Sequence, residues 1–185
     1  MSKRENRVCP VENTAGLDNK FRRLLHNPRK ILLPYIQQGM TALDVGCGPG
    51  FFSIDMAKLV GNNGRVIAAD LQQGMLDKVE AKITGTALEN RIILHKCSEN
   101  RIGVTETVDF VLLFYMAHEV QKKSEFFKEI EEILNPAGRI LIVEPPFHVS
   151  RSAFEETVNT AIAAGFTQAA GPRIPLNKTV ILRKS

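Results

Sequence analysis

The sequence predicts an α/β fold: a Rossmann-like, doubly wound sheet that is mostly parallel and has helices on both faces. Strand-like and helix-like segments alternate from residue 27 onward, and several of the strands are nearly all apolar. Strands of a parallel sheet are buried on both faces by helices, so they lack the alternation of apolar and polar residues seen in half-exposed strands. Two strand-like segments at the C-terminal end add an antiparallel hairpin and bring the expected number of strands to seven.

The first expected element is a helix that begins at Asn27-Pro28, with Asn as N-cap and Pro in the first turn. Apolar residues recur at helical spacing as far as Gly39, and Pro34 is expected to kink or divide the helix. Five strands are expected after it, at 40–45, 65–70, 91–96, 108–116 and 139–144. The helices between them are expected at 51–60, around an apolar face of Met75, Leu76, Val79 and Ile83, and at 121–134.

The last part of the chain continues this pattern. A turn at 135–138, Asn-Pro-Ala-Gly, is expected to introduce the fifth strand. Ser152 and Glu155 have the spacing of a capping box, which predicts a helix running toward Ala164. The segments FTQAAGPRI and KTVILRK then predict the closing hairpin.

Composition places the chain among ordinary globular proteins, with 44% hydrophobic and 24% charged residues. No apolar run approaches the roughly 18 residues that a membrane span needs, and the first residues lack the apolar core of a secretory signal. We therefore expect a cytoplasmic protein. Cys9, Cys47 and Cys97 form no CxxC pair, which argues against a disulfide framework and against a metal cluster.

The positive charge is concentrated near the N-terminus. Residues 1–30 hold eight Lys or Arg against three acidic residues, while the rest of the chain is close to neutral. A patch for nucleic acid or an anionic substrate is one interpretation, and a solvated helix face or flexible arm is the favoured one. We divide the chain into a basic extension at 1–26, which is a candidate lid, and a main domain at 27–185.

The stretch LDVGCGPG, residues 43–50, lies between the first strand and the helix after it. In open α/β sheets ligands bind at the carboxyl ends of strands, and missing side chains let a ligand approach the main chain. Gly46, Gly48 and Gly50 therefore mark a candidate binding site. A tight turn with no ligand is the alternative, which three glycines between a strand and a helix make the less favoured.

Two common ligand classes fit this turn poorly. Dinucleotide-binding sheets use GxGxxG, in which the third glycine allows close packing of helix and strand. Counting from Gly46, that third position is Phe51, a bulky residue. A phosphate-binding P-loop is excluded because no Lys followed by Ser or Thr completes the glycine motif.

The pattern Asp-x-Gly-x-Gly-x-Gly at 44–50 resembles that of the class I S-adenosylmethionine-dependent methyltransferases. Three further segments, VIAADLQQGML, VDFVLLFYMAHEV and LNPAGRILIVEPP, resemble the family's second, fourth and fifth strand regions in the expected order. The resemblance covers about residues 27–145. It is greatest to the small-molecule branch, which includes quinone-biosynthesis methyltransferases.

This resemblance implies a role for each matching residue in holding S-adenosyl-L-methionine. Asp44 would orient the ammonium group at the methionine end, and Asp70 would accept hydrogen bonds from both ribose hydroxyls. The close backbone contact is expected from Gly46, Cys47, Gly48 and Gly50.

The remaining cofactor contacts are expected at or after the ends of the second, third and fourth strands. Leu71 and Met75 would pack against the adenine face, although helical spacing also allows a plain core role. Cys97 stands where relatives often have an acid at the adenine edge, so backbone groups of Ser98 are expected to recognise the adenine instead. The carbonyl of Phe114 would contact the amino group of the cofactor.

Tyr115 and His118 are the candidate catalytic residues, because they follow the fourth strand on the expected acceptor side. His118 is a candidate general base, since an unperturbed imidazole titrates near 6.5. The alternative is that His118 only caps or orients its loop; His148 is a second, less favoured base. Methyl transfer from a sulfonium is an in-line displacement that depends mainly on proximity and alignment, so the reaction does not require a catalytic dyad.

The expected acceptor is a small, apolar or aromatic molecule, because the segment 114–117 offers an apolar lining and no Asn-Pro-Pro-Tyr-like motif. Two other functions stay open: a cofactor-binding protein without transferase activity, and an RNA methyltransferase anchored by the basic arm. Nucleic acid is not the favoured partner, no membrane span is expected, and a homodimer is left open as an assembly.

We predict that residues 17–25, with the apolar strip Phe21, Leu24 and Leu25, form a short helix that gates the acceptor pocket. Gating elements belong to the least stable parts of a fold, so they contribute little to core stability. Deletion of residues 1–25 is expected to leave a folded protein that binds the cofactor and has lost methyl transfer. Failure of the truncated chain to fold would identify the segment as core, and full activity would show that it is neither lid nor anchor.

Overall fold

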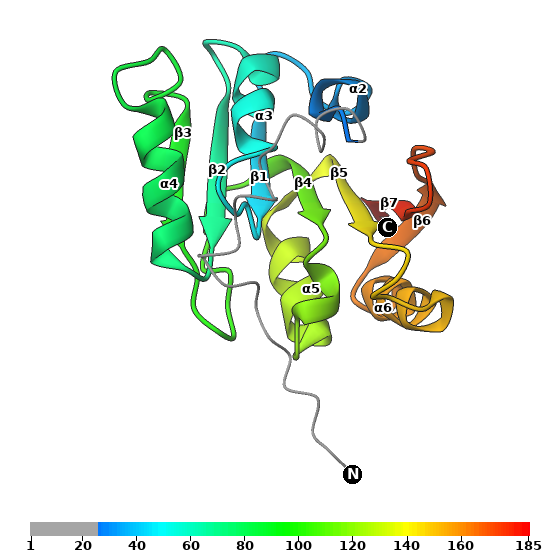
Figure 1. Ribbon diagram of the computed structural model, residues 1–185. Helices are drawn as coiled ribbons and strands as arrows, with labels where there is room; N and C mark the ends of the chain where they lie inside the picture. Colours follow the sequence, from blue (N-terminus) through cyan, green and yellow to red (C-terminus); the bar gives the residue numbers. More distant parts are fainter. Residues whose placement is uncertain (1–25) are drawn as a thin grey trace.

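A seven-stranded sheet organises residues 26–185, the part of the chain that the computed structural model describes (Figure 1). The predicted N-terminal helix at 17–25 lies outside these residues. The strands follow the order β3-β2-β1-β4-β5-β7-β6. Strands β1 to β5 are parallel, whereas β7 runs antiparallel to both β5 and β6. The predicted fold class, a mostly parallel sheet with a C-terminal antiparallel hairpin, is confirmed.

The elements alternate along the chain as expected. The strands are β1 (Thr41–Val45), β2 (Arg65–Asp70), β3 (Ile92–Lys96), β4 (Val108–Phe114), β5 (Leu134–Glu144), β6 (Phe166–Ala170) and β7 (Lys178–Lys184). The helices are α2 (Pro28–Leu32), α3 (Ser53–Val60), α4 (Gln73–Ile83), α5 (Lys123–Ile133) and α6 (Arg151–Ala163), with a short 3-10 helix, η2 (Ala117–Glu119).

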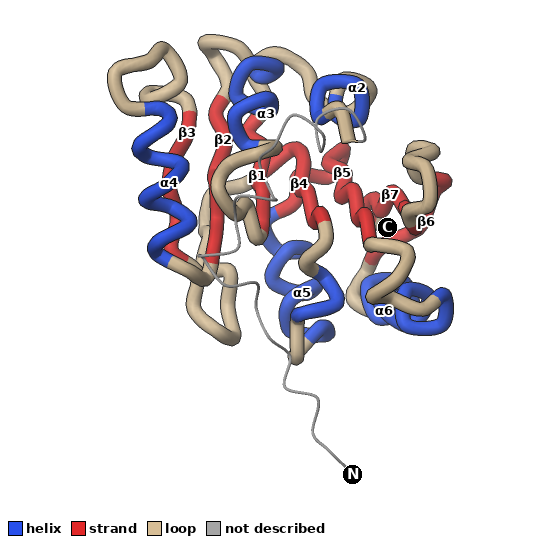
Figure 2. The backbone as a smooth tube through the Cα atoms, viewed as in Figure 1, coloured by secondary structure: helices blue, strands red, loops and turns tan. Residues whose placement is uncertain are grey.

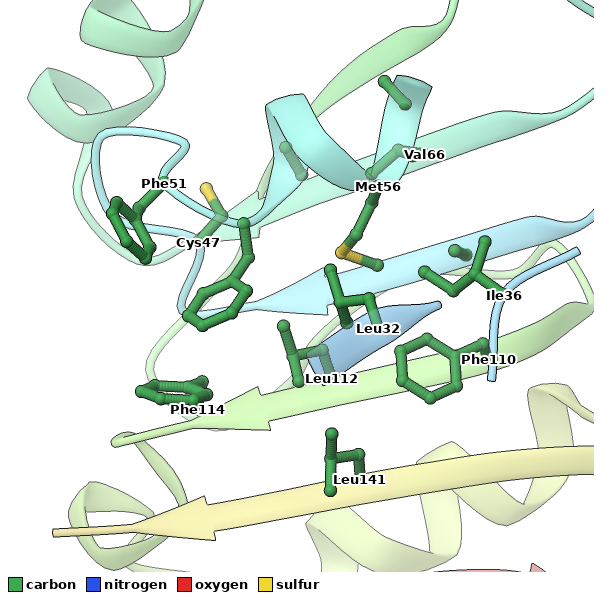
Figure 3. Packing of buried hydrophobic residues seen from close by; sticks show 14 of the residues in the cluster. Leu32, Ile36, Cys47, Phe51, Met56, Val66, Phe110, Leu112, Phe114 and Leu141 are labelled. Atoms are coloured by element: carbon green, nitrogen blue, oxygen red, sulfur yellow. The ribbon is translucent and has the colours of Figure 1, made fainter. Parts of the chain in front are cut away.

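Helices cover both faces of the sheet (Figure 2). Alternate residues of each strand face opposite layers, so neighbours such as Ala42 and Leu43 belong to different cores. Helices α2, α3 and α4 supply one core; α5 and α6 supply the other. Figure 3 shows the first core, where Met56 of α3 and Leu32 of α2 pack over Phe110 and Leu112 of β4. Burial on both faces explains why the central strands are nearly all apolar.

The predicted apolar face of α4 is confirmed, since Met75, Leu76, Val79 and Ile83 are all buried. The predicted extent of the first helix as far as Gly39 is wrong, because α2 ends at Leu32, whereas the division expected at Pro34 is confirmed. The Leu33 amide donates to the Arg29 carbonyl, but Pro34 has no N–H with which to continue the pattern.

Several further boundaries differ from the sequence predictions. Strand β4 ends at Phe114 and not at Met116, because Tyr115 adopts a φ of 61°. Residues 135–138 do not form a separate turn. They bulge within β5, where the register jumps from Val108↔Leu134 to Phe110↔Arg139. The N-cap of α6 is Ser150, whose side chain accepts from the Ala153 amide. The capping box predicted at Ser152 is therefore wrong, because the helix begins before that residue.

No helix between residues 26 and 185 is long and apolar enough to cross a lipid bilayer.

Candidate active site

The candidate site lies where β1, β2 and β4 end at the same edge of the sheet. Strand β1 pairs with β2 on one side and with β4 on the other, so the chain changes direction across the sheet at β1. Loops after neighbouring strands separate at such a point and leave a crevice above the strand ends, which is where open α/β sheets bind ligands.

The three glycines after β1 all have left-handed backbones, with φ of 68° at Gly46, 54° at Gly48 and 83° at Gly50. Their surroundings differ. A Cβ at Gly46 would lie 3.0 Å from Cβ of Met116, and a Cβ at Gly50 would lie 3.1 Å from Cγ2 of Val79 in α4. A Cβ at Gly48 would have no atom within 4 Å. Two of the glycines therefore make room for this chain's own side chains, and Gly48 is the one that faces open space.

Hydrogen bonds attach the glycine turn to its neighbours. The amides of Gly46 and Cys47 both donate to the Ala69 carbonyl of β2, at 2.8 and 3.0 Å. The Lys82 side chain of α4 donates to the Pro49 carbonyl at 2.6 Å. These bonds attach the turn to β2 and α4, and the side chains of Cys47 and Phe51, which belong to the turn, are buried (Figure 3).

Asp70 ends β2 beside this turn, and its side chain is 6% exposed. Its Oδ2 accepts from the Gly48 amide at 2.9 Å and its Oδ1 from the Gln72 amide at 2.8 Å. Burial raises the pKa of the carboxyl above its ordinary value, and the two amides and Lys96 partly oppose that rise. Each carboxylate oxygen keeps further acceptor capacity, so Asp70 can take hydrogen bonds from two hydroxyls of a ligand.

Asp44, predicted to orient the cofactor's ammonium group, is also buried. Its Oδ2 accepts from the Ser53 hydroxyl at 2.6 Å, at the start of α3. Sequence reasoning missed Ser53, and only its position in the first turn of the helix after the glycines could have indicated it. This bond fixes the carboxylate between strand and helix, while the ammonium contact stays a prediction.

The predicted adenine side gathers around the ends of β2 and β3. Met75 is buried in the α4 interface and Leu71 is half-buried. The Cys97 amide donates to the Asp70 carbonyl at 2.9 Å, and burial, with the nearby Asp70 charge, raises the pKa of the Cys97 thiol to about 11. Ser98 pairs through its amide and carbonyl with Arg101, so its backbone groups already have a partner within the loop.

Lys96, at the end of β3, is a residue that the sequence reasoning did not select. Its ammonium group donates to the Leu71 carbonyl, and its charge acts on both Asp70 and Cys97. Lys96 therefore connects the ends of β2 and β3 beside Asp70.

Aromatic rings line the end of β4. The Phe114 ring lies 4.3 Å from that of Phe52 and 4.5 Å from that of Tyr115, measured between centroids. The Tyr115 hydroxyl donates to Oδ1 of Asn177 and lies 3.1 Å from Nε2 of His26. The structure thus joins Tyr115 to two residues that are remote in the sequence and that sequence reasoning did not select.

His118, the other candidate catalytic residue, is paired with Glu144 at the end of β5. Its Nδ1 lies 2.6 Å from Oε2 of Glu144, and its backbone amide donates to Oε1 at 2.9 Å. The bond with Glu144 raises the pKa of the imidazole. With Nδ1–H donating to a buried carboxylate, Nε2 is the ring atom that can accept or release a proton. His148, the less favoured base, is exposed on the loop after β5.

Sequence reasoning missed Glu144, although an acid at the end of the fifth parallel strand was a usable signal. Glu119 lies nearby, and burial raises the pKa of its carboxyl. This side of the site therefore combines an imidazole with two carboxyl groups, whereas the Tyr115 side is aromatic.

Comparison with known proteins agrees with this geometry. A family model described as a methyltransferase domain matches residues 36–172. The chain belongs to this methyltransferase family. Demethylmenaquinone methyltransferase of Lactobacillus johnsonii is 32% identical over 132 residues, which are 71% of this chain and 52% of that protein. The corresponding protein of a Geobacillus species is 29% identical over 109 residues, 59% of this chain and 47% of its own length.

The chain thus spans about half the length of the curated relatives it matches. Among solved structures, a SAM-dependent methyltransferase from Aquifex aeolicus superposes with a TM-score of 0.83 at 25% identity, covering 95% of this chain and 98% of that one. A putative O-methyltransferase from Nostoc punctiforme shares the fold, with a TM-score of 0.73 over 94% of this chain and 60% of its own, at 15% identity. The predicted class I methyltransferase family is confirmed.

The different surroundings of the glycines give a stability prediction. Gly48→Ala is expected to lower the free energy of unfolding by about 1–2 kcal/mol, because an L-residue must then adopt a left-handed backbone. Gly50→Ala is expected to cost more, since the added Cβ also displaces Val79. Chemical denaturation measures both values. Equal losses would show that the contact with Val79 relaxes without cost.

The His118–Glu144 pair gives a pH prediction. A histidine whose folded pKa is raised stabilises the folded state fully below the unfolded pKa, here 6.5, and loses that contribution as pH rises through the folded pKa. The difference in unfolding free energy between wild type and His118→Gln is therefore expected to be larger at about pH 6 than at about pH 9, two values on either side of the range in which an imidazole titrates. His148→Gln, at an exposed site, is the control. A difference independent of pH would contradict the pairing.

Proposed function

We propose that this chain binds S-adenosyl-L-methionine over the ends of β1 and β2 and transfers its methyl group to a small aromatic acceptor of the quinone type. The observation that carries the proposal is the pairing of the Gly48 turn with Asp70: an open backbone surface beside a buried carboxylate with spare acceptor capacity. Membership in the methyltransferase family supports the reaction, and the names of the relatives support the acceptor class.

The residues of the site fit a nucleoside with a ribose diol and a charged amino-acid end. Asp70 would accept the two ribose hydroxyls, and Gly48 would let the ligand approach the main chain without a steric clash. Lys96 and Cys97 would bound the adenine, and Asp44 and the Phe114 carbonyl would face the methionine end. When bound, the cofactor supplies an activated methyl group on a sulfonium, and this chain supplies alignment and exclusion of water.

The acceptor would lie beyond β4, between the aromatic side and the His118–Glu144 pair. Rings of Phe114 and Tyr115 offer an apolar surface that suits an aromatic molecule. Nε2 of His118 would take a proton from the acceptor where the acceptor needs to lose one, and Glu144 would stabilise the resulting imidazolium. A base held in this way is most effective above its raised pKa, where the imidazole is neutral.

Titration calorimetry with S-adenosylmethionine, its demethylated product and NAD in parallel tests the cofactor assignment. We expect the first two to bind and NAD to bind more weakly or not at all, because Phe51 stands where a dinucleotide fold has glycine. Tighter binding of NAD would refute the proposal. Binding of S-adenosylmethionine without turnover of a quinone-type acceptor would refute the acceptor class and favour one of the two other functions, a cofactor-binding protein or an RNA methyltransferase.

Asp70→Ala is expected to cost about 1.5–3 kcal/mol of cofactor binding, typical for hydrogen bonds to a charged group, so the affinity falls about tenfold or more. Asp109→Ala is the matched control: Asp109 also accepts a backbone amide, that of Thr41 at 2.9 Å, but at the other end of β1. It should lower stability and leave cofactor affinity unchanged. Equal affinity in wild type and folded Asp70→Ala would show that the ribose assignment is wrong.

A further inference from the structure

Two exposed apolar residues lie at the edge of the sheet where the candidate site is formed. In the described part of the chain, Phe147 and Leu176 are the most exposed of the large apolar residues, at 87% and 77%. Phe147 follows β5 by three residues, and Leu176 precedes β7 by two. Strands β5 and β7 pair directly, with Glu144 opposite Lys178 (Figure 1). Both residues therefore leave the sheet at the edge where Glu144 holds His118.

The two loops that carry these residues are attached to the rest of the fold. A proline directly precedes each of the two residues and restricts the backbone there. Val149 is buried in the loop after β5, and Ile174 is buried in the loop between β6 and β7. The Lys178 ammonium group also donates to the Pro146 carbonyl at 3.4 Å, which joins the two loops. Each loop thus buries one apolar side chain and leaves another in solvent.

Leu176 combines exposure with backbone strain. Its φ is 65°, in the left-handed region that is unfavourable for leucine. Contacts in a protein core can offset strain of this kind, but Leu176 lies at the surface. Strained residues gather at functional sites. A strained leucine on the surface therefore indicates that its side chain is used there.

The charge in these two loops is positive. Residues 145–151 and 171–178 contain Arg151, Arg173 and Lys178 and no acidic residue. Arg151 is paired with a glutamate of α6, whereas Arg173 is an exposed cation beside the apolar residues of its loop. Positive charge thus accompanies exposed apolar surface in both loops.

The most basic part of the chain also contacts one of these loops. Residues 1–30 hold eight Lys or Arg against three acidic residues. Within this segment, Nε2 of His26 lies 3.4 Å from Nδ2 of Asn177, the residue directly after Leu176. The basic segment therefore reaches the β6–β7 loop through His26.

We propose that the loops 145–150 and 171–177 dock this protein onto an anionic lipid surface, with Phe147 and Leu176 entering the boundary between headgroups and acyl chains. Burial of apolar side chains gives affinity for such a boundary, and Lys and Arg attract the anionic headgroups. An apolar contact alone would also suit a protein partner. The absence of acidic residues from both loops and the basic segment beside them favour the lipid surface.

Docking at this edge would place the proposed acceptor side next to the lipid. The loop after β5 continues from Glu144, the partner of His118, and Asn177 of the other loop accepts from the Tyr115 hydroxyl. An apolar acceptor of the quinone type could then pass from the lipid to the site without crossing water. This delivery step rests on the proposed function, whereas the docking itself does not.

Cosedimentation of the full chain with lipid vesicles tests the docking. We expect binding to vesicles of equal parts phosphatidylglycerol and phosphatidylcholine, and much weaker binding to vesicles of phosphatidylcholine alone. Added salt is expected to weaken binding to the mixed vesicles, because it screens the attraction between exposed charges.

Phe147→Asn and Leu176→Asn are each expected to weaken binding to the mixed vesicles about tenfold or more, since each removes an apolar side chain that the lipid would bury. Asparagine tolerates a left-handed backbone, so the fold should accept the change at Leu176. Leu33→Asn is the matched control, because Leu33 is 57% exposed but lies outside both loops. Thermal unfolding verifies that each variant is folded.

Arg173→Gln tests the contribution of charge. It is expected to weaken binding about fivefold, which is the effect of one cation near an anionic surface. Arg65→Gln is the control, since Arg65 begins β2 at the opposite edge of the sheet and pairs with Glu106.

Methyl transfer tests the delivery step. Transfer to a 1,4-dihydroxynaphthalene that carries a long hydrocarbon chain and is embedded in mixed vesicles is expected to fall in Phe147→Asn. Transfer to free 1,4-dihydroxynaphthalene in solution is expected to stay as in wild type. Equal losses with both acceptors would overturn the delivery step.

The outcomes separate this proposal from the proposed function. Equal binding to both kinds of vesicle, or binding that Phe147→Asn and Leu176→Asn leave unchanged, would overturn the docking. Absence of vesicle binding together with self-association that these two substitutions abolish would overturn it in favour of a second copy of the chain. Vesicle binding by a protein that does not bind S-adenosylmethionine would support the docking and refute the proposed function.

Discussion

The hydrogen bond from the Gly48 amide to the Asp70 carboxylate joins the two halves of the candidate site. It connects the turn after β1 to the end of β2. The second oxygen of the same carboxylate accepts from the Gln72 amide, directly before α4. A buried carboxylate is costly unless it is hydrogen-bonded, so the position of the turn and the charge of Asp70 depend on each other. The proposed cofactor site depends on this arrangement, because it fixes the position of the Gly48 backbone relative to the ends of β1 and β2.

The three glycines of the turn are needed for different reasons. All three adopt a left-handed backbone, which favours glycine, and Gly46 and Gly50 also leave space for the side chains of Met116 and Val79. Those contacts join the turn to the segment after β4 and to α4, respectively. A side chain at Gly46 or Gly50 would therefore displace one of these neighbours, whereas a Cβ at Gly48 would meet no other residue and would strain only the backbone of the turn.

The proposed acceptor side is built differently, from pairs of residues that lie far apart along the chain. Glu144 at the end of β5 fixes His118, and Asn177 beyond β6 fixes Tyr115 together with His26. Parallel topology makes this arrangement available, because every parallel strand ends at the same edge and β7 begins there. His26 is also the last residue of the basic extension, 1–26, that we expect to form a lid.

The sequence by itself determined the alternation of elements, the buried faces of the strands and of α4, the hairpin and the location of the glycine turn. These features follow from local periodicity and from backbone preferences, which act over a few residues. The tertiary structure decided which of two nearby serines caps α6, where β4 ends, the bulge in β5 and the different tasks of the three glycines. It also decided the partners of Asp44, His118 and Tyr115. Such contacts depend on which segments the folded sheet brings together. The number of residues between two positions in the chain does not give the distance between them in the folded protein.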